Sequence, residues 1–440
     1  MGLPNFLLIL IILPTMLSAS PDHQTMLLKL CNDIENKESC LTNIQQELMN
    51  TQLKDPDEHQ RRNSILSAAL KNSLNEARAA IEMITRFNSL SINYREQVAI
   101  EDCKELLDFS VSELAWSLGE MRIIRSGSND AHHEGNLKAW LKGSGEYRTI
   151  TEAVNAAPSY SNRRYVIYVK KGVYRENIDM KRKKTNIMFV GDGIGKTVVT
   201  GDRNFMQGST TFRTATVAVS GKGFIARDMT FRNTAGPENH QAVALRVDSD
   251  QSAFFRCSME GHQDTLYAHS LRQFYRECDI YGTIDFIFGN GAAVLQNCKI
   301  YTRVPLPLQK VTIAAQGRKN PHQSTGFSIQ YSYVLATQPT YLGRPWKQYS
   351  RTVYMNTYMS GLVQPRGWLE WYGDFALGTL WYGEYRNYGP GARLSGRVKW
   401  PGFHVIRDAA TANFFTVGRF IDGMSWLPST GIKFIRGLTN

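Results

Sequence analysis

The 440-residue sequence lacks the features of several classes of protein. Beyond the apolar stretch that ends at Leu13, no segment is long and apolar enough to cross a membrane. The chain has no Asn-x-Ser/Thr sequon, so we expect no N-linked glycan. It has no Gly-x-Ser-x-Gly motif, which argues against an esterase with a serine nucleophile. It also carries no helix-turn-helix, zinc-finger or RNA-binding signature.

The chain carries an excess of positive charge, with a formal net charge of +12. Such a balance favours a polyanionic partner, and without a nucleic-acid-binding signature an acidic polysaccharide fits better than nucleic acid. The basic run 181–184 (KRKK) could contact this polyanion, but we favour a solvated loop. The segment 191–197 (GDGIGKT) is similar to a phosphate-binding loop, but its first glycine is one position away from the Gly-x-x-x-x-Gly-Lys-Ser/Thr spacing. A strand-like segment follows where such a loop needs a helix, so we discount this motif.

The first 20 residues are typical of a secretory signal peptide. Their apolar core, Phe6–Leu13, is followed by small residues at 18–20, although no Lys or Arg precedes it. In an exported chain the six cysteines can form disulfides. Cys31 and Cys40, nine residues apart, could close a short hairpin.

Two segments with different patterns of apolar residues follow. Residues 22–141 are predicted to be a small α-helical bundle, because apolar residues recur every three or four positions, as from Leu66 to Ile84 and from Cys103 to Leu118. The polar segment 125–135 is expected to be a loop or linker. From about residue 145 short β-rich runs alternate with Gly, Asn and Asp, without long amphipathic helices. The predicted strands are Tyr165–Val169, Ile187–Val190, Thr216–Val219, Phe224–Ala226, Ala242–Val247, Phe274–Tyr275, Asp285–Phe288 and Thr352–Tyr354.

A repeat of 20 to 22 residues runs through the centre of this β-rich segment. Cys257 and Cys278 each stand seven residues before an aspartate, Asp264 and Asp285, and a third copy begins at Cys298. Such a period indicates a solenoid, and hence a parallel β-helix rather than a sandwich or a βαβ sheet. Residues one period apart then lie side by side, about 4.8 Å from strand to strand. The tail, 408–440, is expected to pack over the coils as loops and short helices.

Stacking would make Asp264 and Asp285 neighbouring carboxylates. At about 5 Å and an effective dielectric constant of about 20, their repulsion is roughly 3 kcal/mol, or about two pKa units. One would then stay protonated near neutral pH while the other is ionised, which suits an acid beside a nucleophile or base. Gln241 and Gln263, 22 residues apart, should also stack and could donate hydrogen bonds to an oxyanion.

The three stacked cysteines allow either a disulfide or a buried row of free thiols. The spacing of successive coils falls within the Cα distance that a disulfide needs, and only one pair of Cys257, Cys278 and Cys298 could bond.

The chain resembles the plant pectin methylesterases. Five segments carry the resemblance in order: GVYRE (172–176), QAVAL (241–245), QDTLY (263–267), DFIFG (285–289) and LGRPW (342–346). The resemblance covers residues 145–440 and implies a right-handed parallel β-helix. We therefore expect a signal peptide (1–20), a helical inhibitor-like pro-region (21–141) and a catalytic β-helix (142–440), in a secreted monomer of the cell wall.

The resemblance also implies a role for each site residue. Asp285 matches the nucleophile that attacks the methyl ester of galacturonate, and Asp264 matches the general acid and base. Gln241 and Gln263 match the oxyanion donors, and Arg344 would orient Asp285. Trp346 would lie against a sugar ring, although it could instead fill the core, and Arg344 could be a structural ion pair. Thr211 matches a substrate contact, and Cys278–Cys298 is the implied disulfide. No metal or cofactor is expected.

The helical segment resembles the inhibitor-like pro-region of many plant pectin methylesterases, through Cys31, Cys40 and the segment 100–114. Here the chain departs from the pattern. Leu141 leads almost directly to GSGEYRTI, so a helix, the partner of Cys103 and the basic processing site are missing. The resemblance thus implies that this truncated module could inhibit the catalytic domain of the same chain.

Three alternatives to a pectin methylesterase remain at this point. Two carboxylates about 5 Å apart could also serve a retaining glycosidase, and a β-helix could be a calcium-dependent pectate lyase. The stacked glutamines and LGRPW argue against both. The third alternative is non-catalytic: an inhibitor or wall-binding protein in which the helical module acts.

Overall fold

The computed structural model describes residues 71, 73–75, 77–82, 137–140 and 147–438. The chain divides into two compact units, residues 1–132 and 133–440. In the first unit the described residues between 71 and 82 are helical, with Leu74 and Ala77 buried, as the apolar spacing predicted. The rest of the predicted helical bundle, the linker 125–135, the signal peptide and Cys31, Cys40 and Cys103 lie outside the described residues.

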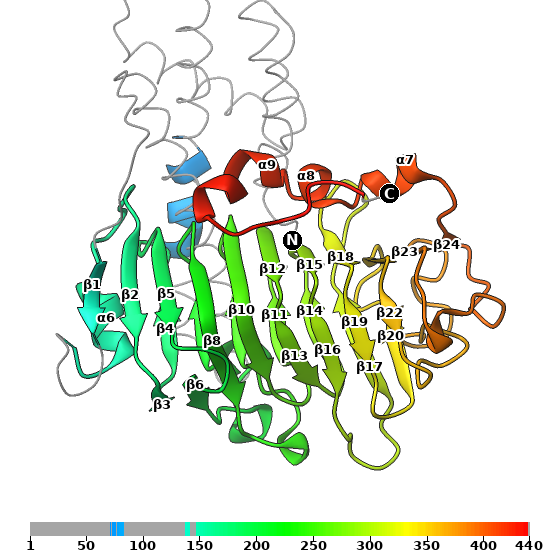
Figure 1. The fold of residues 1–440 in the computed structure, drawn as a ribbon, viewed down its shortest axis with the longest axis horizontal. Helices are drawn as coiled ribbons and strands as arrows, with labels where there is room; N and C mark the ends of the chain where they lie inside the picture. The colour runs from blue at the N-terminus through cyan, green and yellow to red at the C-terminus, as the bar shows by residue number, and fades with distance from the viewer. Residues whose placement is uncertain (1–70, 72, 76, 83–136, 141–146, 439–440) are drawn as a thin grey trace, which may run out of the picture. The chain divides into compact units, whose positions relative to one another are not determined.

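The second unit is a stack of parallel strands (Figure 1). The described strands form one 17-stranded and one 7-stranded sheet. In the larger sheet, the nine-residue strands β8 (Ile225–Asn233) and β10 (Ser252–Glu260) each bend across two faces and so join them. Together with the smaller sheet, the coils therefore have three faces, as in a parallel β-helix. The predicted solenoid is confirmed.

Two faces make up the larger sheet. Besides β8 and β10, its strands are β1 Leu137–Trp140, β2 Tyr165–Val169, β3 Gly172–Arg175, β5 Ile187–Gly191, β6 Thr197–Gly201, β12 Arg272–Arg276, β13 Asp279–Gly282, β15 Ala292–Gln296, β16 Lys299–Thr302, β18 Gly326–Gln330, β19 Tyr333–Leu335, β21 Arg351–Met355, β22 Tyr358–Met359, β23 Trp381–Tyr385 and β24 Phe403–Val405.

The third face is the 7-stranded sheet. Its strands, in spatial order, are β4 Ile178–Met180, β7 Val217–Val219, β9 Leu245–Val247, β11 Leu266–Ala268, β14 Ile284–Gly289, β17 Val311–Gln316 and β20 Thr340–Gly343. All eight strands predicted from the sequence are present, with ends that differ by a few residues. The prediction succeeded because each run is rich in apolar, β-branched and aromatic residues, and turn-forming residues separate one run from the next.

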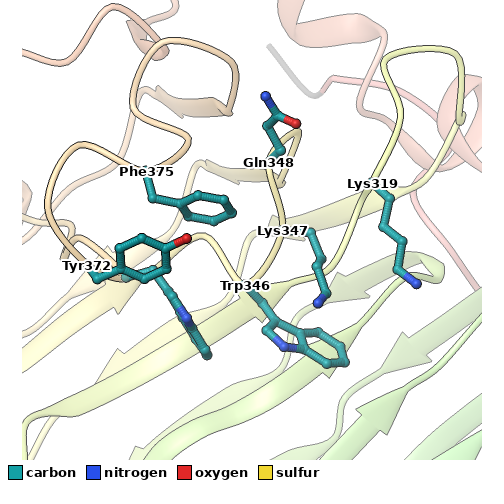
Figure 2. A pocket seen from close by; sticks show the side chains of 7 residues that line it. Lys319, Trp346, Lys347, Gln348, Tyr372 and Phe375 are labelled. Carbon is teal, nitrogen blue, oxygen red and sulfur yellow. The ribbon is translucent and has the colours of Figure 1, made fainter.

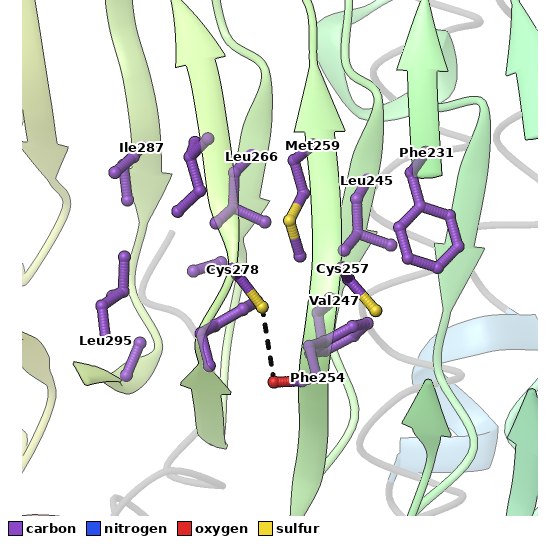
Figure 3. Close-up of a cluster of buried hydrophobic side chains, with 14 of the residues drawn as sticks. Phe231, Leu245, Val247, Phe254, Cys257, Met259, Leu266, Cys278, Ile287 and Leu295 are labelled. Atoms are coloured by element: carbon purple, nitrogen blue, oxygen red, sulfur yellow. Dashed lines mark hydrogen bonds between the residues drawn. The ribbon is translucent and has the colours of Figure 1, made fainter. Parts of the chain in front are cut away.

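Stacked apolar side chains fill the inside of the coils (Figure 3). Phe254 of β10 pairs with Tyr275 of β12, and their rings stack at 4.9 Å between centroids. Cys257, Cys278 and Cys298 belong to the same core and are free, fully buried thiols. The disulfide expected between Cys278 and Cys298 is therefore not formed in this structure; Cys278 Sγ instead contacts the carbonyl oxygen of Phe254 at 3.4 Å.

Short helices lie before, between and after the strands of this unit. Near the start lies α6 (Ile150–Ala156), which opens with a capping box between Thr149 and Glu152. The remaining short helices are η2 Phe205–Gln207, η3 Thr211–Thr214, η4 Pro237–Asn239, η5 Pro390–Ala392, α7 Ala409–Asn413, α8 Val417–Phe420, α9 Gly423–Trp426 and η6 Leu427–Thr430.

The C-terminal helices pack along one side of the β-helix, as predicted for residues 408–440 (Figure 1). Val417, Trp426 and Leu427 are buried against Phe274 of β12 and Val294 of β15. Packing of this kind removes apolar side chains from water, which accounts for the order of a segment that has little regular structure.

The basic run 181–184 is largely taken up by structural contacts. Lys184 is buried, and its ammonium group donates to the carbonyl oxygens of Asn155 and Ala157 at the end of α6. Lys181 pairs with Asp179 at 2.6 Å. The interpretation of the whole run as a solvated loop was therefore wrong for Lys184, because helix ends leave carbonyl groups that need donors.

A buried ion pair lies near the last coils. Arg397 and Glu384 are 2% and 1% exposed, and Nε of Arg397 lies 2.7 Å from Oε1 of Glu384. Nη2 of the same arginine also donates to the carbonyl oxygen of Gly391 at 2.8 Å, and Trp368 donates to Glu384. This arrangement satisfies both charges, so removing one partner leaves the other charged and buried.

We expect Arg397→Ala to lower the free energy of unfolding by about 3–5 kcal/mol, because Glu384 would lose its countercharge. Denaturant unfolding of the two proteins measures the difference. Arg366→Ala is the matched control, since Arg366 and Glu370 form an exposed pair at 2.9 Å, for which we expect less than about 1 kcal/mol. Equal losses in both variants would contradict this account.

Candidate active site

Asp264 and Asp285 lie on neighbouring strands of the third face. Asp264 stands two residues before β11 and Asp285 is the second residue of β14. The two strands pair in parallel, with Leu266 opposite Ile287, and the backbone N–H of Asp264 donates to the carbonyl oxygen of Ile284 at 3.1 Å. The 21-residue interval therefore places the two aspartates on adjacent coils, as predicted.

A β-bulge turns Asp285 out of the core. The register between β14 and β17 shifts between Ile284 and Ile287, so that Phe286 and Ile287 both point into the core. Asp285 adopts a left-handed backbone with φ of +51°, which is uncommon for a residue with a side chain. Without the extra residue, strict alternation from the outward Phe288 would direct Asp285 inward. The bulge is therefore what presents this carboxylate at the surface of the third face.

The space for this bulge comes from a glycine on the preceding strand. A Cβ atom placed on Gly282 of β13 would overlap the Cβ atom of Phe286. Only glycine leaves room for Phe286 to turn inward at this position. The motif DFIFG thus depends on the glycine three residues before it.

Arg344 forms an ion pair with Asp285. It follows β20 directly, and its Nη2 and Nε atoms lie 2.6 Å from Oδ2 and 2.8 Å from Oδ1 of Asp285. Burial is the largest single influence and lowers the pKa of Arg344, but the hydrogen bonds and charge of Asp285, with the charges of Asp264 and Tyr382, together raise it, so the net shift is upward. The guanidinium group also stacks on Trp371, with Cζ 4.3 Å from the ring centroid.

Asp264 differs from Asp285 in its partners, since both are buried, at 8% and 5% exposed. Burial, with a further contribution from the charge of Asp285, raises the pKa of Asp264 well above the usual value, and Arg344 offsets a part of this shift. The site therefore holds an aspartate with a raised pKa next to an arginine-paired aspartate, an arrangement suited to acid–base chemistry at a carbonyl.

The two glutamines lie beside this pair. The backbone N–H of Ala242 donates to the carbonyl oxygen of Gln263 at 3.2 Å, so Gln241 and Gln263 are on adjacent coils as the sequence predicted. The side-chain oxygen of Gln241 is buried without a hydrogen-bond partner. This oxygen can only accept a hydrogen bond, so a donor role toward an oxyanion would fall to the NH2 group of the same amide.

Aromatic side chains cover the third face around these residues. Trp346 lies 5.9 Å from Phe288 and 6.5 Å from Tyr267, measured between ring centroids. Phe212 lies 6.5 Å from Tyr267 and directly follows Thr211, the first residue of η3. All seven residues named from the sequence, Thr211, Gln241, Gln263, Asp264, Asp285, Arg344 and Trp346, thus lie on or beside the third face.

A pocket of about 430 Å³ extends this surface (Figure 2). It is lined by Lys319, Trp346, Lys347, Gln348, Trp371, Tyr372 and Phe375. Lys347 Nζ lies 5.3 Å from the centroid of the Trp346 ring, and the Tyr372 and Phe375 rings stack at 4.9 Å. Rings together with ammonium groups suit an acidic sugar polymer, because the rings pack on sugar faces and the lysines attract carboxylates.

Sequence reasoning missed some residues of the site. Thr312 donates from its hydroxyl to Oδ1 of Asp285 at 2.6 Å, and Trp371 supports Arg344. Thr312 follows Asp285 by 27 residues, since a loop separates β16 from β17, and so it falls outside the 20- to 22-residue repeat. Nothing in the sequence marks Trp371 as a partner of Arg344.

The structure also bears on metal binding and on membrane insertion. Within residues 147–438 and the shorter described segments, no group of three or more His, Cys, Asp or Glu side chains is placed to hold a metal ion. The helices of the same segments include none with the length and hydropathy of a membrane span.

Comparison with known proteins covers both units. Residues 139–424 match the Pectinesterase family model, and residues 25–155 match the model for the plant invertase/pectin methylesterase inhibitor. A pectinesterase/pectinesterase inhibitor of Arabidopsis thaliana is 56% identical, over 95% of this chain and 94% of its own length. One from Prunus persica is 43% identical, over 84% of this chain and 88% of its own.

Solved structures give the same result for the β-helix. The pectin methylesterase from carrot is 53% identical, with a TM-score of 0.68 over 71% of this chain and all of that chain. The pectin methylesterase from Aspergillus niger is 28% identical, with a TM-score of 0.58 over 68% of this chain and 98% of its own. By sequence and by fold, the chain belongs to the pectinesterase family.

Proposed function

We propose that this protein hydrolyses the methyl esters of pectin with Asp285 as nucleophile and Asp264 as acid and base. The observation that carries the proposal is the contrast between two adjacent aspartates. One is buried with a raised pKa, and the other is bound by Arg344. Pectin as substrate is supported by the family and by a pectin methylesterase solved in complex with a hexasaccharide, which is 25% identical with a TM-score of 0.56.

The first half of the reaction forms an acyl-enzyme. A carboxylate oxygen of Asp285 attacks the ester carbonyl carbon of a methylated galacturonate, and the carbonyl electrons move onto the oxygen. The amides of Gln241 and Gln263 donate hydrogen bonds to this oxyanion. As the tetrahedral intermediate collapses, the bond to the methoxy oxygen breaks. Asp264 supplies the proton, so methanol leaves and an anhydride with Asp285 remains.

The second half restores the enzyme. Asp264, now ionised, takes a proton from a water molecule, and the resulting hydroxide attacks the galacturonate carbonyl carbon of the anhydride. The bond to Asp285 then breaks. The products are galacturonic acid, which releases its remaining proton to the solvent and becomes the carboxylate, and the Asp285 carboxylate, which again pairs with Arg344. Asp264 ends the cycle protonated, the state that its burial favours.

We further propose how the substrate lies. Trp346 would pack on a sugar ring, and Thr211 would contact the chain from the side of Phe212. The net charge of +12 would attract pectin, whose acidic groups increase as the esters are removed. This agrees with secretion to the cell wall, which the N-terminal residues 1–20 predict.

We also propose that residues 21–141 are a shortened inhibitor-like module. The alignment with the Arabidopsis relative spans 518 positions, more than the 440 residues of this chain, so parts of that relative have no counterpart here. The junction at Leu141 is where the sequence suggests such a loss. In the structure β1 (Leu137–Trp140) pairs with β2, with Leu137 opposite Val166, so residues before this junction serve as the first strand of the coils.

One assay separates this proposal from its alternatives. Highly methylated pectin is incubated with the protein, and methanol, reducing ends and unsaturated ends are measured together. We expect methanol alone. New reducing ends would support a glycosidase and unsaturated ends a lyase, whereas no product would favour a binding or inhibitory protein.

A further inference from the structure

Thr312 makes two hydrogen bonds with one residue, the nucleophile proposed above. Its hydroxyl oxygen accepts the backbone N–H of Asp285 at 3.0 Å, and its hydroxyl donates to Oδ1 of the same aspartate at 2.6 Å. Thr312 is fully buried in β17, and its own backbone N–H donates to the carbonyl oxygen of Thr283 at 3.1 Å. Thr312 is therefore held by its backbone on one side and by its hydroxyl on the other.

The backbone contact fixes the direction of the hydroxyl. An N–H can only donate, so Oγ1 of Thr312 must accept from Asp285, and its single proton is left for the carboxylate. A β-branched side chain has few rotamers, which limits other arrangements of this group. The hydroxyl thus ties the backbone of Asp285, in its strained left-handed conformation, to its own carboxylate.

The donors are shared unequally between the two carboxylate oxygens. Oδ1 accepts from Thr312 at 2.6 Å and from Nε of Arg344 at 2.8 Å. Oδ2 accepts from Nη2 at 2.6 Å, while Nε is farther from it, at 3.1 Å. The single proton of Nε is shared between the two oxygens and lies nearer Oδ1. Since a carboxylate oxygen has roughly two lone-pair sites, both sites of Oδ1 are well occupied, whereas the second site of Oδ2 holds only the longer part of this shared contact.

We propose that Thr312 is a positioning residue for this reaction: its hydroxyl holds Oδ1 of Asp285 and thereby presents Oδ2 to the ester carbonyl. The inference rests on the proposed function, because it needs Asp285 to be the nucleophile. Thr312 itself does not touch the substrate, since it is buried beneath the carboxylate. It supplies orientation, which is effective in catalysis when the attacking atom is held close to its target.

The test replaces the hydroxyl by a methyl group of the same size. Thr312→Val is expected to lower kcat for methanol release about 10- to 100-fold, the range for losing a hydrogen bond to a charged group. KM should not change, because no substrate contact is removed. Thr312→Ser keeps the hydroxyl and should recover most of the lost kcat.

Thr340→Val is the matched control for stability. Thr340 is also fully buried, in the adjacent strand β20, and its hydroxyl donates to the carbonyl oxygen of Gln338 at 2.6 Å. It should lose thermal stability as Thr312→Val does, yet keep kcat. An unchanged kcat in Thr312→Val would overturn the inference. Equal kcat losses in both valine variants, or a change confined to KM, would do the same.

Two further outcomes are distinguishable. If Thr312→Val does not fold, Thr312→Cys, which keeps a weaker donor, is compared with Thr312→Ser. A lower kcat in the cysteine variant supports the inference, and equal kcat values overturn it. If instead the unaltered protein releases no methanol, or Asp285→Ala remains active, the proposed function fails rather than the role of Thr312.

Discussion

Asp285→Ala is expected to lower methanol release from methylated pectin by about 10,000-fold or more, the scale seen when a covalent nucleophile is removed. The reason is that Arg344 binds the carboxylate of Asp285, and alanine leaves no attacking oxygen at this position. Binding of pectin should remain nearly intact, because the aromatic side chains on the third face do not depend on this carboxylate. Methanol release and affinity electrophoresis in pectin gels measure the two quantities.

A control for this variant comes from the same sheet. Asp179, in β4, is exposed and pairs with Lys181, so Asp179→Ala removes an aspartate without touching the site. We expect its turnover to equal that of the unaltered protein. Turnover by Asp285→Ala at the rate of this control would refute Asp285 as the nucleophile.

Asp264→Asn should have two opposite effects. Methanol release should fall about 100- to 10,000-fold, because an amide cannot give its proton to the leaving methoxide. At neutral pH, however, the variant should be more thermally stable than the unaltered protein. Burial of Asp264 makes its ionisation unfavourable in the folded state, and asparagine is neutral at every pH.

The pH dependence of stability follows from the same shift. The folded-state pKa of Asp264 is raised, so between its unfolded value, about 3.9, and its folded value the native state binds more protons than the unfolded chain. The stability contributed by the protonated group is complete below about pH 3.9 and is lost as pH rises through the folded pKa. The variant lacks this loss.

Melting temperatures measured from pH 4 to pH 8 test this directly. The difference in Tm between Asp264→Asn and the unaltered protein should be small near pH 4 and should grow as pH rises. Asp179→Asn serves as the exposed control, for which we expect no such trend. A variant that is less stable than the unaltered protein at pH 7 would contradict the raised pKa.

Much of the fold could be predicted because it is periodic. The interval between Asp264 and Asp285 equals one coil, so the sequence alone placed them on adjacent strands. The same reasoning placed Gln241 beside Gln263. Local patterns of this kind survive folding because parallel strands stack in register, one coil above the next.

Non-periodic features could not be predicted. Thr312 reaches Asp285 only because the chain returns after a longer loop to the next coil, and Arg344 and Trp371 meet across still greater separations. The ammonium group of Lys184 serves the end of α6, although its basic run suggested a solvated loop. Contacts of this kind depend on which surfaces meet, and sequence spacing does not encode them.

The sequence by itself determined a stack of coils with the acids, amides and arginine of one family on its central turns. Tertiary structure decided which aspartate has the raised pKa and which is turned out of the core, because both depend on surroundings. Packing removes Asp264 from water and raises its pKa, whereas Asp285, which is also buried, is paired with Arg344. The bulge turns Asp285 out of the core, and Gly282 leaves the room that lets Phe286 pack inward. Burial and strand parity are properties of the packed coils and not of any one segment.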